Sequence, residues 1–172
     1  MGSNETENAA ADGGASIGGS FTLTDQDAKV RTDLDFRGHW LVVYFGYTYC
    51  PDTCPTTLQE IADAFRQLGP RSRDIVPVFI TLDPARDRPA VLRKYLAAFG
   101  PEFVGLTGTP AQIASVAHAY RVYYTKHPLA GGGYAIDHAS AIYLMAPDGR
   151  FASLLDDQQG AGMLARELGA RL

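Results

Sequence analysis

The chain is poor in cysteine, and that scarcity excludes a fold held together by a disulfide framework. Only two cysteines, Cys50 and Cys54, occur among 172 residues. A disulfide scaffold needs more cysteines at wider spacing, and a domain of this size buries enough apolar surface to fold without them. A pair this close is therefore expected to do chemistry, through either redox exchange or metal binding.

Long apolar runs and blocks of basic residues are also missing. No apolar stretch approaches the length of a membrane span. Acidic and basic residues are mixed along the chain, the net charge is −4, and no basic stripe marks a nucleic-acid surface. Nucleic acid is therefore not an expected partner. The hydrophobic fraction of 46% is typical of a globular protein.

The first nineteen residues differ in composition from the rest. Residues 2–19 are rich in Gly, Ala, Ser and Asn, which is typical of a disordered leader or tether. The start Met1-Gly2-Ser3 resembles a remnant of an expression vector, so we expect that a native signal or membrane anchor has been removed. We expect residues 1–19 to be this leader, and residues 20–172 to form one domain.

Hydrophobic patterning predicts strands that alternate with helices, and hence an α/β fold with a central mixed sheet flanked by helices. The expected strands are an N-terminal β-hairpin over 21–32, buried strands at 40–46 and 75–82, a strand at 121–125, and a hairpin of 139–145 with 150–155. The expected helices are 55–68, 89–99, 110–120 and 158–172. Thr57 and Glu60 predict a capping box near the start of the first helix, and residues 127–134 predict a mobile loop.

Cys50 and Cys54 lie where a buried strand passes into a helix, which is where α/β folds place their sites. Thiols four residues apart on a helical turn share a face, and the positive end of the helix favours thiolate over thiol. Two convergent thiolates form a soft anionic site that prefers Cu(I) or Zn(II) to Mg(II) or Ca(II). Metal binding and a plain redox pair both stay open at this point.

A third metal ligand would have to come from elsewhere, and the chain offers four histidines. His39 precedes a strand and is expected at the surface, His118 lies within a predicted helix, and His127 lies in the predicted mobile loop. His138 directly precedes the strand predicted at 139–145, which puts it at the edge of the sheet. By position, His138 is the best candidate.

Three segments, in the same order, resemble the signatures of the Sco/SenC family of copper proteins. They are residues 44–55 (YFGYTYCPDTCP), 81–87 (TLDPARD) and 134–138 (YAIDH), within a match that runs from about residue 19 to the end. The resemblance implies a thioredoxin-like fold.

The same resemblance assigns the ligands of one copper ion per chain, Cu(I) or Cu(II), to Cys50, Cys54 and His138. Many family members have His where Tyr49 stands. Because that histidine is not one of the three ligands, the departure leaves the ligand set intact.

Four charged residues lie near the expected metal. Asp83 and Asp137 are candidates to hydrogen-bond a ligand or a water molecule, although capping of its own loop is an equally open role for Asp83. Asp137 is expected to orient His138 or the loop rather than bind metal. Arg86 and Asp87 are expected to stabilise a turn as a pair.

Family members are membrane-anchored, with the domain in the bacterial periplasm or the mitochondrial intermembrane space, and assist assembly of the binuclear copper centre of cytochrome c oxidase. The resemblance therefore implies a metallochaperone rather than an enzyme. Its expected partners are the copper-accepting subunit of the oxidase and other periplasmic copper carriers. We expect a monomer, anchored on the periplasmic side of the inner membrane.

Two redox functions compete with copper delivery. A thiol–disulfide oxidoreductase that reduces the oxidase subunit's cysteines fits the thiols at a helix start. Thioredoxin-type enzymes, however, usually place two residues between their cysteines and a cis-proline opposite them, and no proline occurs between residues 134 and 145. A peroxidase or redox sensor is less favoured, because Thr48 is only two residues before Cys50.

Overall fold

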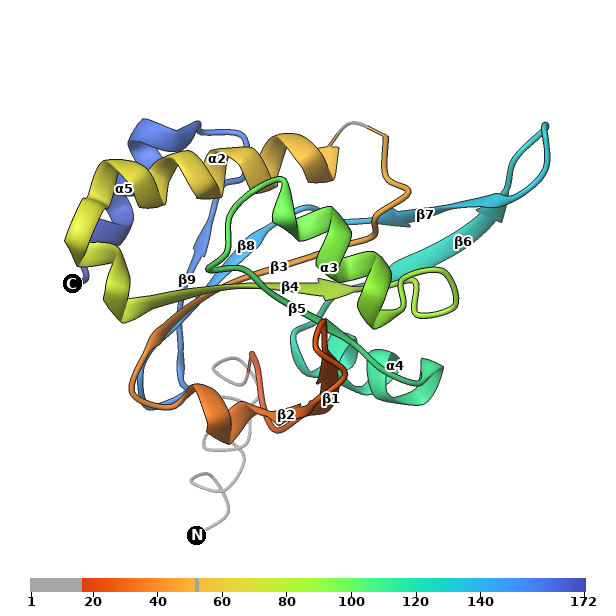
Figure 1. Ribbon diagram of the computed structural model, residues 1–172, viewed down its shortest axis with the longest axis horizontal. Coiled ribbons are helices and arrows are strands. Elements are labelled where there is room, and N and C mark those ends of the chain that lie inside the picture. Colours follow the sequence, from red (N-terminus) through yellow and green to blue (C-terminus); the bar gives the residue numbers. More distant parts are fainter. Residues whose placement is uncertain (1–16, 52) are drawn as a thin grey trace, which may run out of the picture.

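The computed structural model describes residues 17–51 and 53–172. Its centre is a seven-stranded mixed sheet in the order β2-β1-β5-β4-β3-β8-β9, and β6 and β7 form a separate two-stranded sheet (Figure 1). The strands are β1 (Thr22–Asp25), β2 (Val30–Thr32), β3 (Trp40–Gly46), β4 (Ile75–Thr81), β5 (Val104–Thr107), β6 (Tyr124–Pro128), β7 (Tyr134–His138), β8 (Ile142–Met145) and β9 (Phe151–Leu155). The helices of the described part are α2 (Thr53–Leu68), α3 (Pro89–Ala97), α4 (Pro110–Ala119) and α5 (Ala161–Gly169), with short 3-10 turns η1 (Asp33–Phe36) and η2 (Gly69–Asp74).

The central strands are apolar on both faces. Alternate side chains of a strand point to opposite faces, so Val42 and Tyr44 of β3 join one core while Val43 and Phe45 join the other. β3 pairs in parallel with β4 along its whole length and antiparallel with β8. This confirms the strand buried on both faces that the continuous apolar run predicts.

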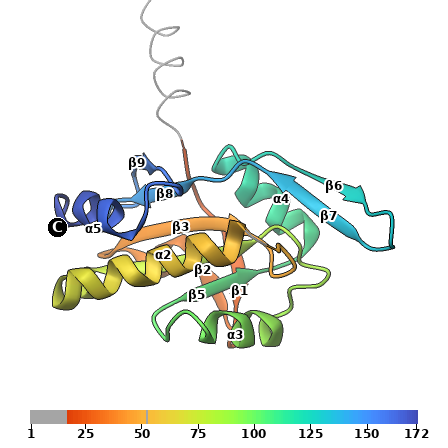
Figure 2. The ribbon, with the colours of Figure 1, turned by 90° about the horizontal axis from the view of Figure 1, so that it is seen from above.

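Helices cover both faces of the sheet (Figure 2). Leu58 of α2, Leu92 of α3 and Leu164 of α5 pack into one core, and Ile113 and Val116 of α4 pack into the other. The predicted α/β fold, with a mixed sheet between helices and an N-terminal hairpin of β1 and β2, is confirmed. Among the described residues no helix is long and apolar enough to span a membrane.

The hairpin of β6 and β7 was not predicted. Of the segment 127–134, expected to be a mobile loop, residues 129–133 form the turn of this hairpin, closed by a hydrogen bond from Leu129 N to Gly133 O of 3.1 Å, while His127 and Pro128 belong to β6 and Tyr134 to β7. The strand expected at 139–145 begins only at Ile142. Most of the β6 side chains are exposed, so the strand carries no apolar alternation that sequence patterning could detect. As a consequence, His138 ends β7 in the small sheet instead of preceding a strand of the large one.

Two further strand predictions need correction. β5 was not predicted, because it has only four residues and contains a glycine and therefore shows no apolar run. The strand expected from Arg121 starts three residues later, because Arg121 adopts a left-handed conformation with φ of 60° after α4. Val122 N then donates to Ala117 O at 2.8 Å, a bond that satisfies a carbonyl at the end of the helix.

Helix α2 begins at Thr53, two residues earlier than predicted, which places Cys54 inside the first helical turn. Pro55 is tolerated there because amides of the first turn have no partner within the helix. The capping box predicted for Thr57 and Glu60 is wrong, since Thr57 is buried well inside the helix. The helix predicted at 158–172 is confirmed in part, as α5.

Candidate metal centre

The candidate site lies at the carboxyl ends of two neighbouring parallel strands. β3 ends at Gly46 and β4 at Thr81, and these two residues are paired, so the loops that follow meet at one edge of the sheet. The loop after β3 carries Cys50, and the loop after β4 carries two buried carboxylates. The β6–β7 hairpin reaches the same edge, as a shared cavity shows. Cys50 therefore lies where the sequence predicts it, in the loop between a buried strand and a helix at the carboxyl edge of the sheet.

Cys50 and His138 line one cavity of about 280 Å³. Both residues are half-buried. The remaining wall is contributed by the cysteine loop, the start of α2, β7 and the segment before β8: Tyr47, Pro51, Thr53, Ile136, Asp137 and Ser140. A thiol and an imidazole from segments far apart in the chain therefore share one cavity.

Cys54 is fully buried beneath this cavity. Its sulfur packs against β3 so closely that a Cβ atom at Gly46 would lie 2.7 Å from it. Burial first, and then a hydrogen bond to Cys50 and electrostatic repulsion from that residue, raise the pKa of Cys54 to about 12. The expectation that the helix start makes this thiol a thiolate is therefore wrong for Cys54, because desolvation outweighs the helix dipole.

A buried polar chain runs from Cys54 towards the end of β9. The Tyr44 hydroxyl lies 3.9 Å from the Cys54 sulfur and 3.1 Å from Ser140 Oγ. Ser140 donates to Asp157, and Thr57 Oγ1 lies 3.5 Å from the same carboxylate. Asp157 is buried, so these hydroxyls provide the hydrogen bonds that a buried carboxylate needs.

His138 is held by the backbone and by one aromatic ring. Its Nδ1 lies 3.1 Å from the carbonyl oxygen of Ala139. A carbonyl only accepts, so this bond places the proton on Nδ1 and leaves Nε2 free as an acceptor or ligand. The imidazole meets the Tyr47 ring edge-on at a centroid distance of 6.2 Å. The Tyr47 hydroxyl in turn accepts from the Ile136 amide at 3.3 Å.

Of the two roles expected for Asp137, orienting His138 or orienting the loop, its contacts fit the second. Its side chain is 76% exposed, and its Oδ2 lies 2.9 Å from Nδ1 of His127 on the facing strand. Adjacent residues of a strand point to opposite faces, so Asp137 and His138 diverge. His39 and His118 are exposed.

Asp83 is fully buried and binds the hairpin rather than a candidate ligand. It accepts a hydrogen bond of 2.5 Å from the Tyr134 hydroxyl and another from Arg86 Nε. The Arg86 guanidinium lies 4.2 Å from the ring centroid of Tyr49 and 3.8 Å from that of Tyr134. The ion pair predicted between Arg86 and Asp87 is therefore replaced by the pair of Arg86 with Asp83.

Asp87 fastens the cysteine loop to β4. This fully buried carboxylate accepts from the Thr48 amide at 2.9 Å, from the Thr48 hydroxyl at 2.5 Å and from the Thr81 hydroxyl at 2.6 Å. A buried ionised carboxylate is tolerated when its oxygens are satisfied in this way. Asp87 therefore fixes the cysteine loop at Thr48, two residues before Cys50.

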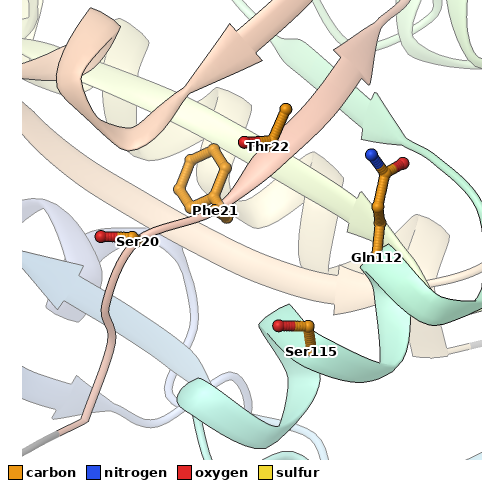
Figure 3. Close-up of a pocket in the computed structure, with 5 residues that line it drawn as sticks. All are labelled: Ser20, Phe21, Thr22, Gln112 and Ser115. Carbon is orange, nitrogen blue, oxygen red and sulfur yellow. The ribbon is translucent and has the colours of Figure 1, made fainter.

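Across residues 17–51 and 53–172, no group of three His, Cys, Asp or Glu side chains is arranged to hold a metal ion. The structure brings Cys50 to Cys54 and brings Cys50 and His138 to one cavity, but it does not gather all three. A second cavity of about 270 Å³ lies between β1 and α4 (Figure 3). Its lining of Ser20, Phe21, Thr22, Gln112 and Ser115 includes no thiol, imidazole or charged group, so it offers none of this chemistry.

The chain matches a known protein family over nearly its whole length. The family model described as SCO1/SenC matches residues 9–172, nearly the whole chain. The chain belongs to the SCO1/SenC family. The resemblance of the three sequence segments is thereby confirmed, and so is the thioredoxin-like fold of Sco structures.

Individual Sco relatives agree with the family match. "Protein SCO2 homolog, mitochondrial" of Bos taurus is 45% identical over 141 residues, which cover 80% of this chain and 53% of the relative. The chain thus spans about half the length of that relative. The structure of Bradyrhizobium japonicum ScoI with copper bound is 44% identical, has a TM-score of 0.85, and is matched over 91% of this chain and 99% of its own.

A more distant Sco structure shares the fold. BsSco, described with a disulfide switch and as a member of the Sco family of cytochrome c oxidase assembly proteins, is 21% identical with a TM-score of 0.73. The match covers 91% of this chain and 93% of that one. At this level of identity the likeness shows the fold alone.

Sequence reasoning missed the buried supports of this SCO1/SenC site. The sequence predicts only a turn pair for Asp87, and no pattern in it joins Tyr44, Ser140 and Asp157. Asp87 gave a weak signal, as a carboxylate just after a buried strand. Asp157 gave none, since its contact with Thr57 joins residues 100 positions apart.

Proposed function

We propose that this SCO1/SenC domain is a copper metallochaperone that delivers copper during assembly of the binuclear copper centre of cytochrome c oxidase. The observation that carries the proposal is the Cys50–Cys54 pair at the end of β3, with His138 on the cavity above it. Support comes from the SCO1/SenC family match over residues 9–172 and from the Bradyrhizobium relative, whose structure is seen with copper bound.

One copper ion per chain would be held by Cys50, Cys54 and His138. Two thiolates suit the soft ion Cu(I), and an imidazole also accommodates Cu(II), so a change of oxidation state need not expel the metal. Both thiols must lose their protons to bind. Because burial keeps Cys54 protonated in the metal-free protein, copper binding releases protons and the affinity rises with pH.

The exposure of the three candidate ligands predicts the order in which an acceptor would replace them. Cys50 and His138 are half-buried at a cavity, whereas Cys54 is fully buried. Thiol and imidazole ligands of an acceptor would therefore replace His138 and Cys50 first and Cys54 last. Gathering the three ligands around one ion requires a shift of the β6–β7 hairpin or of the cysteine loop.

The partner and the location follow from the same proposal. The acceptor is the copper-binding subunit of the oxidase, and other copper carriers outside the cytoplasm would supply the metal. The domain would be membrane-anchored and face the periplasm, or the intermembrane space in a mitochondrion. The description of the bovine relative as mitochondrial supports a compartment where cytochrome c oxidase is assembled. The domain would act as a carrier and not as an enzyme.

Thiol–disulfide exchange is a second candidate, favoured by one specific contact. Cys50 and Cys54 are both free and are hydrogen-bonded to each other, so oxidation could join them. Cys50, the more accessible thiol, would attack a disulfide of the oxidase subunit, and Cys54 would resolve the mixed disulfide. Each full cycle would leave Cys50 and Cys54 oxidised and two partner thiols reduced. The raised pKa of Cys54 slows that second step.

Copper titration separates the two functions. We expect the reduced protein to bind one Cu(I) or one Cu(II) per chain, with thiolate-to-copper absorption for Cu(II). His138→Ala should lose Cu(II) affinity most severely. His127→Ala, which removes a histidine from the same hairpin, should bind as the wild type does. If the wild type binds neither ion tightly but exchanges rapidly with a disulfide substrate, the oxidoreductase function replaces copper delivery.

A further inference from the structure

We propose that Arg86 is a positioning residue that clamps the β6–β7 hairpin, and with it His138, onto the cysteine loop. The inference rests on the proposed function, because it concerns how the third ligand is held near the two thiols. Arg86 belongs to the loop after β4 and contacts both segments that carry candidate ligands.

The guanidinium of Arg86 lies between two aromatic rings. The ring centroid of Tyr49 is 4.2 Å away and that of Tyr134 is 3.8 Å away. Tyr49 directly precedes Cys50, and Tyr134 is the first residue of the strand that ends at His138. One cation therefore joins the cysteine loop to the histidine strand through attraction to both ring faces.

A buried carboxylate fixes this cation to the body of the fold. Asp83 is fully buried, accepts from Arg86 Nε and from the Tyr134 hydroxyl, and its own amide donates to Thr81 Oγ1 at 2.9 Å. Thr81 is the last residue of β4 and also donates to Asp87, which holds the cysteine loop. The clamp is thus anchored in the central sheet.

The hairpin has few other attachments. β6 and β7 pair with each other and with no strand of the large sheet among the described residues, and Figure 2 shows them extending from the body. Two other contacts join the hairpin to the cysteine loop, both through Tyr47: its hydroxyl to the Ile136 amide, and its ring to His138. Ile136 is also buried in the core. These contacts lie at the His138 end of β7, whereas Arg86 and the hydrogen bond from Tyr134 to Asp83 restrain the Tyr134 end.

The planar guanidinium suits this position better than an ammonium group would. Arg86 Nη2 is buried and has no hydrogen-bond partner among the described residues, so the group is retained by its ring contacts and by the Asp83 pair. A lysine would keep the positive charge for Asp83 but would lack the flat surface that stacks on two rings. Arg86→Lys therefore weakens the clamp without leaving a buried carboxylate unpaired.

The test uses two variants and a matched control. Arg86→Lys removes the planar guanidinium but keeps the positive charge, and Tyr134→Leu removes both the ring and the hydroxyl that donates to Asp83 while leaving Arg86 paired with Asp83. Tyr123→Leu is the control, since this tyrosine precedes the same hairpin and is 79% exposed. In metal-free protein, we expect amide exchange of residues 134–138 to be about tenfold faster in both variants and unchanged in the control.

A spectroscopic readout distinguishes positioning from a general loss of stability. In the Cu(II)-loaded variants we expect weaker nitrogen hyperfine coupling from imidazole in electron paramagnetic resonance, while thiolate-to-copper absorption stays. Unchanged amide exchange in Arg86→Lys would overturn the proposal, even if Tyr134→Leu loosened the hairpin, because the ring and hydroxyl of Tyr134 would then hold it without the guanidinium. If the wild type itself lacks nitrogen coupling, the ligand role of His138 fails, and amide exchange in the metal-free protein still decides whether Arg86 clamps the hairpin.

Discussion

At the scale of single residues, the two cysteines have the same side chain but differ in solvent exposure. Cys50 is half-buried at the cavity, while Cys54 is fully buried against Gly46. The first thiol can meet a partner protein, and the second is protected from it. Gly46 makes this burial possible, because any larger residue would occupy the space of the Cys54 sulfur.

Gly46→Ala should therefore destabilise the protein and displace Cys54. The new methyl group would lie 2.7 Å from the Cys54 sulfur and 3.0 Å from the Phe79 ring. Overpacking of this kind costs about 1–3 kcal/mol of unfolding free energy, measurable by urea denaturation. Gly162→Ala is the control: it lies in α5, nothing is within 4 Å of its added Cβ, and it should be neutral or stabilising. Equal stability of the wild type and Gly46→Ala would contradict this account of the packing.

At the scale of elements, the loop after β4 organises the other two parts of the site. Asp87 binds the cysteine loop through Thr48, and Asp83 binds the hairpin through Tyr134 and Arg86. Because β3 and β4 end side by side, one short loop can reach both partners. The relative position of the cysteine pair and His138 is therefore set by two carboxylates four residues apart.

Asp87→Asn should loosen the cysteine loop. An amide has one acceptor oxygen, and its NH₂ group would face the three donors that now bind the carboxylate: the Thr48 amide, the Thr48 hydroxyl and the Thr81 hydroxyl. The expected loss is about 1–3 kcal/mol of unfolding free energy, with faster amide exchange at Thr48. Asp63→Asn, which alters an exposed ion pair with Arg66 on α2, should cost under about 1 kcal/mol. Undiminished protection of the Thr48 amide in Asp87→Asn would disprove the anchoring role.

At the scale of the whole molecule, buried ionisable groups make the metal-free fold sensitive to alkali. Burial raises the pKa of Cys54 to about 12 and that of Tyr120 to about 12, and it also raises the pKa values of Tyr44 and Tyr95. In each case the unfolded chain loses its proton at a lower pH than the folded chain. The unfolded state then binds fewer protons, so stability falls as pH rises.

We expect the unfolding free energy of reduced, metal-free protein to be constant up to about pH 9 and to fall above it. Each such group contributes at most about 1.4 kcal/mol per pH unit between its unfolded and folded pKa values. Cys54→Ala should show a shallower fall over the same range, because only the tyrosines remain. Urea denaturation at a series of pH values measures both slopes. If the unfolding free energies of the two proteins fall in parallel with pH, Cys54 does not contribute to the loss of stability in alkali.

Much of the architecture was predictable because it depends on local patterns. The apolar run of β3 and the periodicity of α2, α3 and α4 identified those elements to within a few residues. The β6–β7 hairpin was missed because a ribbon exposed to solvent shows no apolar alternation. β5 was missed because four residues are too few for a pattern.

The sequence by itself determined the family, the α/β fold and the three candidate ligands, because these depend on short motifs and on periodicity. Only the tertiary structure decided the state of each group. Burial raised the pKa of Cys54, β pairing turned Asp137 outward to His127, and strand ends brought Asp87 to Thr48 across 39 positions and Asp83 to Tyr134 across 51. The physical reason is that desolvation and hydrogen bonding depend on what surrounds a side chain, and those neighbours come from distant parts of the chain.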